Sequence, residues 1–114
     1  MLPKANRLKK KKDFERVFKQ GKSFGESCLL LRLVKNNLKA NRFGFAVGLR
    51  VSKKASLRNK LKRRLREIIR VKLPKIKTGF DVVLIADTGL ADKDFRGVEE
   101  IINNLFKKAK IWSE

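Results

Sequence analysis

The chain has 114 residues, of which 42% are hydrophobic, so it is long and apolar enough to form one globular domain with its own core. It carries 31 Lys and Arg residues against 11 Asp and Glu residues, a formal net charge of +20. Charge of this size destabilises a compact fold unless an anionic partner is bound, so the composition excludes an electrically neutral scaffold and favours a polyanion-binding protein.

The absence of histidine limits the chemistry of the chain. It removes the commonest general base and, with Cys28 as the only cysteine, a zinc site of the usual kind. We therefore predict no catalytic residue and no metal site. A lone cysteine fits a reducing compartment, and no apolar run reaches the ~18 residues that span a membrane. We expect a cytoplasmic protein with no membrane and no small-molecule substrate.

The N-terminal third begins with a basic segment, residues 1–12, which has no periodic apolar face. We expect residues 1–10 to be an extended, flexible arm. A short helix is predicted over Lys11–Gln20, with Gly21 after its end. Phe14, Val17 and Phe18 share one face of this helix. The two phenylalanines either pack in the core or keep a ring edge available to stack on a nucleotide base.

Two strands are predicted next, over residues 27–35 and 42–51, and we expect them to pair as an antiparallel hairpin. The first is nearly continuous leucine, which is typical of a buried strand. Gly44 and Gly48 in the second indicate a bulge or a close approach of another segment. A short basic loop, residues 52–55, then leads into the most unusual segment of the chain.

This segment, residues 56–72, is predicted to be an amphipathic helix capped by Ser56. Glu67 is its only acidic residue, so its polar side is almost entirely cationic. Natural surfaces normally mix both signs of charge, and we therefore favour a polyanion-binding helix over a solvated face or a localisation signal. Its apolar stripe contains Leu57, Leu61, Leu65, Ile68 and Ile69.

The balance of charge changes in the last third of the chain. Residues 1–77 carry 26 basic and 4 acidic side chains, whereas residues 78–114 carry 5 and 7. We therefore expect residues 78–114 to act as scaffold. A buried strand is predicted over residues 81–86, followed by a final helix capped by Asp92. The predicted element order is αββαβα, an α/β (α+β) two-layer sandwich with a mixed sheet of about four strands and packed helices.

Net charge alone does not separate RNA from DNA as the partner. No second helix stands one turn before the basic helix, as a helix-turn-helix protein would require. A basic helix in an α/β sandwich is more typical of proteins that dock on folded RNA. Two hypotheses stay open at this point: a structural RNA-binding protein such as a ribosomal component, and a DNA-binding protein.

Two motifs carry a specific resemblance. Residues 2–8, LPKANRL, and 13–23, DFERVFKQGKS, resemble the N-terminus of the bacterial ribonuclease P protein subunit. Residues 51–54, VSKK, and 58–67, RNKLKRRLRE, resemble the basic helix of that family. Order, spacing and total length agree, so the resemblance covers residues 1–114 as a single RNA-binding domain.

The resemblance implies a ribonucleoprotein that removes the 5′ leader from precursor tRNA, with catalysis by the RNA subunit and its Mg²⁺. It also implies a left-handed crossover from strand to basic helix to parallel strand, against the usual right-handed rule. The partners would be ribonuclease P RNA and precursor tRNA. Leader-binding residues would be Phe14, Phe18 and Arg32. RNA-subunit-binding residues would be Lys53, Lys54, Arg58, Asn59, Lys60, Lys62, Arg63, Arg66 and Arg70.

The chain departs from the family pattern in three places. Only residues 55–57 separate the Ser-Lys-Lys and Arg-Asn elements, where family members often have more. The strand over residues 29–33 lacks the aromatic that often lines the leader cleft, and Arg32 is the expected cationic replacement. Lys60 stands where the motif has an arginine, which keeps the charge and loses the bidentate fork.

Overall fold

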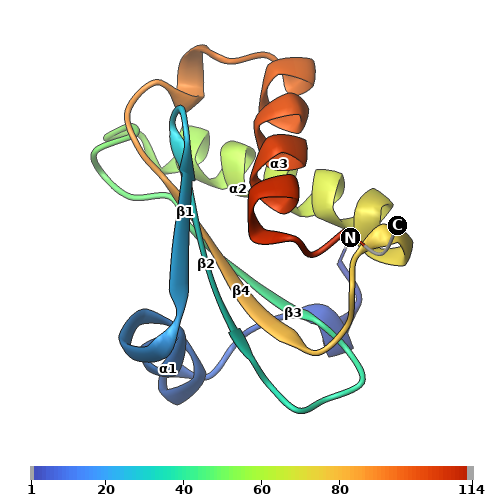
Figure 1. Cartoon of the computed structure of the whole chain (residues 1–114). Helices are drawn as coiled ribbons and strands as arrows, with labels where there is room; N and C mark the ends of the chain where they lie inside the picture. Colours follow the sequence, from blue (N-terminus) through green and yellow to red (C-terminus); the bar gives the residue numbers. More distant parts are fainter. Residues whose placement is uncertain (1, 113–114) are drawn as a thin grey trace.

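In the computed structural model, which describes residues 2–112, a four-stranded mixed sheet carries three α-helices (Figure 1). The predicted α+β class is confirmed, with one strand more than the predicted order contained. The elements are α1 (Lys11–Gln20), β1 (Lys22–Glu26), β2 (Leu29–Lys35), β3 (Arg42–Ala46), α2 (Ala55–Lys72), β4 (Phe80–Ala86) and α3 (Phe95–Ala109), with 3₁₀ turns at Lys4–Asn6, Leu73–Lys75 and Leu90–Asp92.

The strand order is β1-β2-β4-β3. β2 is antiparallel to both β1 and β4, whereas β3 is parallel to β4. The predicted hairpin between β2 and β3 is therefore wrong. β2 instead turns back on β1 through Ser27, whose φ of 54° tightens the turn, and β4 inserts between β2 and β3. The β3–α2–β4 connection joins two parallel strands through the basic helix, as the family resemblance implies.

The main core lies between one face of the sheet and the helices α2 and α3 (Figure 1). Leu29, Leu31 and Leu33 point to this face because side chains alternate along a strand. Four of the five predicted apolar residues of α2 are buried here, and Leu57 is partly buried against the same core. The four are Leu61, Leu65, Ile68 and Ile69.

The opposite face of the sheet is covered only in part, by α1. Val17 and Val83 are fully buried between α1 and β4, together with Leu8. The ring of Phe14 lies directly on Gly44, where a Cβ atom would come within 2.5 Å of two ring carbons. Glycine at this position therefore lets α1 approach β3, which confirms the predicted close approach at Gly44.

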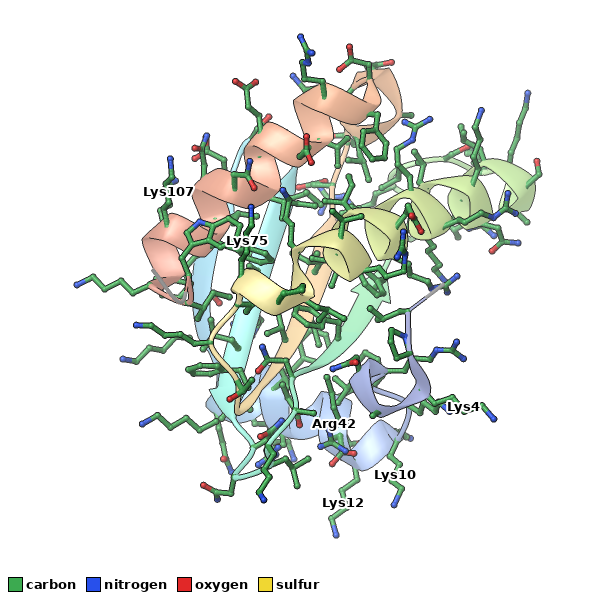
Figure 2. The ribbon with its side chains drawn as sticks, turned by 90° about the vertical axis from the view of Figure 1, so that its right-hand side faces the viewer. Lys4, Lys10, Lys12, Arg42, Lys75 and Lys107 are labelled. Carbon is green, nitrogen blue, oxygen red and sulfur yellow. The ribbon has the colours of Figure 1, made fainter. Side chains whose placement is uncertain are left out.

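The start of the chain packs against the sheet, so the expected extended arm is wrong for residues 2–8. Leu2 and Leu8 are buried, and the Leu8 amide donates to the Phe43 carbonyl at 2.9 Å. This segment covers the edge of β3, which would otherwise expose unpaired backbone groups. Figure 2 shows Lys4, Lys10 and Lys12 projecting away from the protein at this end.

Two helix starts differ from the sequence prediction. α2 begins one residue earlier than predicted, with Lys54 at the N-cap and no side-chain cap, so Ser56 lies inside the first turn. α3 is capped by Asp94 and not by Asp92, since Asp94 Oδ1 accepts from the Gly97 amide at 2.8 Å. Both errors displace a boundary by one or two residues and leave the buried faces unchanged.

A buried ionic cluster holds α1 to the sheet. Asp81, at the start of β4, has no exposed surface and accepts hydrogen bonds from Arg16 of α1, Arg42 of β3 and Asn36. The distances lie between 2.7 and 2.9 Å, and Asp13 also pairs with Arg42 at 3.3 Å. Burial raises the pKa of Asp81, but hydrogen bonds from Arg42, Asn36 and Arg16 outweigh it, so the pKa lies below its ordinary value.

Replacing Asp81 with Asn should therefore destabilise the fold at neutral pH. Breaking a buried pair on one side costs about 3–5 kcal/mol, and we expect the lower end because the arginine side chains are 33% and 23% exposed. Urea unfolding of wild type and D81N at pH 7 measures the difference. Asp92→Asn, an exposed carboxylate on the Leu90–Asp92 turn, is the matched control and should unfold as wild type does.

The same comparison has a defined pH dependence. Because the folded pKa of Asp81 is lowered, its contribution is complete above the unfolded value of about 3.9 and is lost as the pH falls through the folded value. The difference between wild type and D81N should consequently shrink below about pH 4. A difference that stays constant down to pH 2 would contradict an ionised Asp81 as the source of the stability.

Candidate nucleic-acid interface

α2 presents a continuous cationic surface to solvent. The helical period places the charged residues of α2 opposite its buried leucines and isoleucines. The exposed residues among those predicted to bind the RNA subunit lie one after another along this side. We call this surface the basic face. It consists of Asn59, Lys60, Arg63, Arg66 and Arg70.

The loop before α2 extends the basic face. Lys53 and Lys54 are exposed and directly precede the helix, since the short spacer leaves no further loop. Arg58 is half-buried and donates to the Ser52 carbonyl at 3.0 Å, and Ser52 Oγ accepts from the Lys54 amide at 3.1 Å. These bonds fix the loop on the first helical turn, whose positive dipole end carries no acidic residue.

Two predicted helix residues contribute less charge to solvent than their sequence positions suggest. Arg70 pairs with Glu67 at 2.5 Å, and this hydrogen bond raises the pKa of Arg70 while it lowers that of Glu67. Lys62 is half-buried. The exposed arginines Arg63 and Arg66 are therefore the strongest candidates for phosphate contacts among the predicted set.

The two predicted phenylalanines of α1 have different surroundings. Phe14 is half-buried on Gly44, as described above, so its ring has a packing role. Phe18, one turn later, is 46% exposed although its neighbour Val17 is fully buried. Most of the Phe14 ring is therefore used for packing, whereas part of the Phe18 ring remains exposed to solvent.

Arg32 is bound to the end of α1. Its guanidinium donates to the carbonyls of Phe18 and Gly21 at 2.6 and 3.0 Å and to Ser23 Oγ at 2.5 Å. A cation at this end of a helix satisfies carbonyls that have no partner within the helix. Gly21 is extended and not left-handed, and a Cβ atom there would lie 2.3 Å from the Val17 carbonyl oxygen. Arg32 therefore positions the backbone that carries Phe18.

An uncovered strip of the sheet lies next to α1. The strand register aligns Leu30 of β2 with Ile85 of β4 and Ala46 of β3, and all three are only half-buried. They occupy the same face as Arg32, one row of side chains away, since Leu30 lies two residues before Arg32 in β2. Gly25 of β1, exposed, completes this row. We call the row of Gly25, Leu30, Ile85 and Ala46 the open strip.

Phe95 was not singled out by sequence reasoning as an interface residue. It falls on the apolar period of α3, yet it is 47% exposed. It lines a surface hollow of about 350 Å³ together with Lys60, Arg63, Arg64 and Glu67 of α2. The sequence does not distinguish Phe95 from the buried residues of α3. The apolar period extends to the first residue of the helix even where the core beneath the helix ends.

Within residues 2–112, no three His, Cys, Asp or Glu side chains come together in a way that could hold a metal ion. The buried carboxylate of Asp81 is already occupied by three cationic or amide donors. None of the helices in this part of the chain is both long and apolar enough to cross a membrane.

Comparison with known proteins agrees with this geometry. The family model Ribonuclease P matches residues 2–110. The ribonuclease P protein component of Clostridium botulinum (strain 657 / Type Ba4) is 40% identical over 111 residues, which cover 96% of this chain and 99% of that protein.

Solved structures agree as well. The RNase P protein of Thermotoga maritima superposes with a TM-score of 0.81 at 38% identity, covering 90% of this chain and 96% of that one. A Staphylococcus aureus RNase P protein mutant with defective mRNA degradation activity gives 0.88 at 30%, covering 96% and 92%. The chain belongs to the ribonuclease P protein component family.

Proposed function

We propose that this protein binds the catalytic RNA of ribonuclease P with the basic face of α2, and the 5′ leader of precursor tRNA with the open strip beside α1. The observation that carries the proposal is the separation of the two surfaces. One is cationic and helical, and the other is apolar, bordered by an exposed aromatic ring, and lies on the opposite face of the sheet. A protein that only coated structured RNA would need the first surface alone.

Docking on the RNA subunit would be mainly electrostatic. Arginine forks match phosphate oxygens in pairs, whereas lysines act as point charges, so Arg63 and Arg66 fix orientation and the lysines add attraction. Rigid attachment of the loop through Arg58 would let Lys53 and Lys54 reach phosphates together with the helix. The full proposed set is Lys53, Lys54, Arg58, Asn59, Lys60, Lys62, Arg63, Arg66 and Arg70.

The leader would lie on the open strip as a single strand. Phe18 would stack on an unpaired base, since every base has an aromatic face and stacking does not require a particular sequence. Phe14 and Arg32 would contribute by holding α1 against the sheet at the required distance. The half-buried Leu30 and Ile85 would form the apolar floor under the strand.

The RNA subunit and its Mg²⁺ would catalyse cleavage of the precursor tRNA. The acidic side chains of residues 2–112 do not gather into a metal site, so the RNA would supply most ligands of the Mg²⁺. Cationic side chains on phosphates replace bound counterions, and the complex should therefore need less Mg²⁺ than RNA alone. We expect this assembly in the cytoplasm, where its precursor tRNA substrate would be available.

Neutralising the basic face should weaken RNA-subunit binding and reduce its salt dependence. Arg63→Ala with Arg66→Ala removes two potential phosphate contacts, each worth about 0.7–0.9 in the slope of log K against log[salt]. Titration of ribonuclease P RNA at several salt concentrations measures both effects. Lys39→Ala with Lys107→Ala removes the same charge from other exposed sites and should leave the slope near wild type. An unchanged slope for the arginine pair would place the RNA elsewhere.

Phe18→Leu should weaken leader binding selectively. Leucine keeps an apolar side chain on α1 but loses the aromatic face, so precursor tRNA should bind the reconstituted complex more weakly by roughly 1–3 kcal/mol. Mature tRNA, which has no leader, should bind as before. The measurement is the ratio of the two affinities for wild type and variant. A ratio that does not change, with the fold intact, would remove Phe18 from leader binding.

The isolated protein should cleave no RNA at any Mg²⁺ concentration. The chain has no histidine, and its described carboxylates are not arranged for metal binding. Since the Staphylococcus aureus relative is described with an mRNA degradation activity, both precursor tRNA and an mRNA should be tested with protein freed of RNA. Cleavage that co-purifies with the protein and is absent from mock preparations would contradict this prediction.

A further inference from the structure

The hollow around Phe95 has an unusual combination of side chains. Lys60, Arg63, Arg64 and Glu67 are spaced at i, i+3, i+4 and i+7, so they form one stripe of α2 beside the start of α3. Phe95 lies against this stripe with 47% of its surface exposed. Three cations and an aromatic ring that the core does not cover therefore line the same hollow.

The position of the ring is fixed by the fold. Arg64 Nη1 donates to the Lys93 carbonyl at 3.3 Å, which ties the start of α3 to α2. The Asp94 cap on the Gly97 amide sets the direction of the first turn that carries Phe95. The ring is consequently presented beside the cations by two neighbouring contacts, and its exposure is not the result of a loose chain end.

This combination suits one kind of ligand. A protein partner that covered Phe95 would have to bury Lys60 and Arg63 as well, at a high desolvation cost. An unpaired RNA base presents a flat aromatic face, and its flanking phosphates present the negative charge that the cations require. Glu67, at the far end of the stripe, is paired with Arg70, so the phosphates would lie at Lys60 and Arg63, which are exposed.

We propose that Phe95 forms a stacking subsite for one unpaired base of the RNA subunit, with the adjacent phosphates at Lys60 and Arg63. The inference rests on the proposed function of the basic face and extends it from charge to base recognition. It makes the start of α3 part of the interface, although the last third of the chain has no excess of positive charge.

The test compares Phe95→Ala, Phe95→Trp and wild type in binding to ribonuclease P RNA and to a continuous RNA duplex without unpaired bases. Phe95→Ala should bind the RNA subunit about five- to 150-fold more weakly, the range that corresponds to loss of one stacked base. Its salt slope should equal that of wild type, because no charge changes. Phe95→Trp should retain affinity, and neither variant should change duplex binding.

Leu38→Ala is the matched control, since Leu38 is a 49% exposed apolar residue between β2 and β3. It should bind both RNAs as wild type does, and thermal melts should show that all variants fold. Wild-type affinity of Phe95→Ala, with weak binding by the Arg63 and Arg66 variant, would overturn the subsite and keep the proposed function. Equal weakening on the duplex, or a reduced salt slope, would also overturn it. Failure of wild type to bind the RNA subunit would overturn both.

Discussion

The position of α1 on the sheet, and with it the proposed leader-binding surface, depends on one buried carboxylate, Asp81. Arg16 and Arg42 reach it from α1 and β3, and through these bonds the helix that carries Phe18 is fixed to the sheet. Burying a charge is unfavourable unless it is paired and fully hydrogen-bonded, and Asp81 meets both conditions. In a chain with this excess of cations, donors for such a carboxylate are abundant.

Packing and charge act against each other in α2. Like charges three or four residues apart destabilise the helix by roughly 0.2–0.5 kcal/mol per pair. Burying Leu61, Leu65 and Ile68 each contributes about 1.5–3 kcal/mol, so core packing outweighs the repulsion several-fold. Core packing therefore offsets the repulsion within α2, and its unbalanced cationic face stays exposed to solvent.

The elements with a periodic pattern of apolar residues could be predicted from the sequence. The period of α2 and α3 identified both helices and most of their buried residues, and α1 was predicted with its observed bounds. β1 was missed because KSFGE has neither an alternating pattern nor β-branched residues. The insertion of β4 beside β2, by contrast, depends on contacts between residues about 50 positions apart, which no local pattern specifies.

The candidate site could likewise be predicted only where it depends on local sequence patterns. Arg63 and Arg66 were predictable because exposure follows from the helical period, and the structure places both in solvent. The roles of Arg32 and Asp81 were not, since each depends on partners from other elements. Exposure of Phe95 could not be foreseen because it follows from where α3 extends beyond the core, next to α2.

The most direct test of this account is reconstitution with ribonuclease P RNA, followed by cleavage of precursor tRNA across a Mg²⁺ titration. The account requires the protein to neutralise RNA phosphates and to hold the leader. Addition of the protein should therefore shift cleavage to Mg²⁺ concentrations at which the RNA alone is inactive. The Mg²⁺ profile should also move more for a substrate with a leader of several nucleotides than for one with a single nucleotide. Identical profiles with and without the protein would contradict the account.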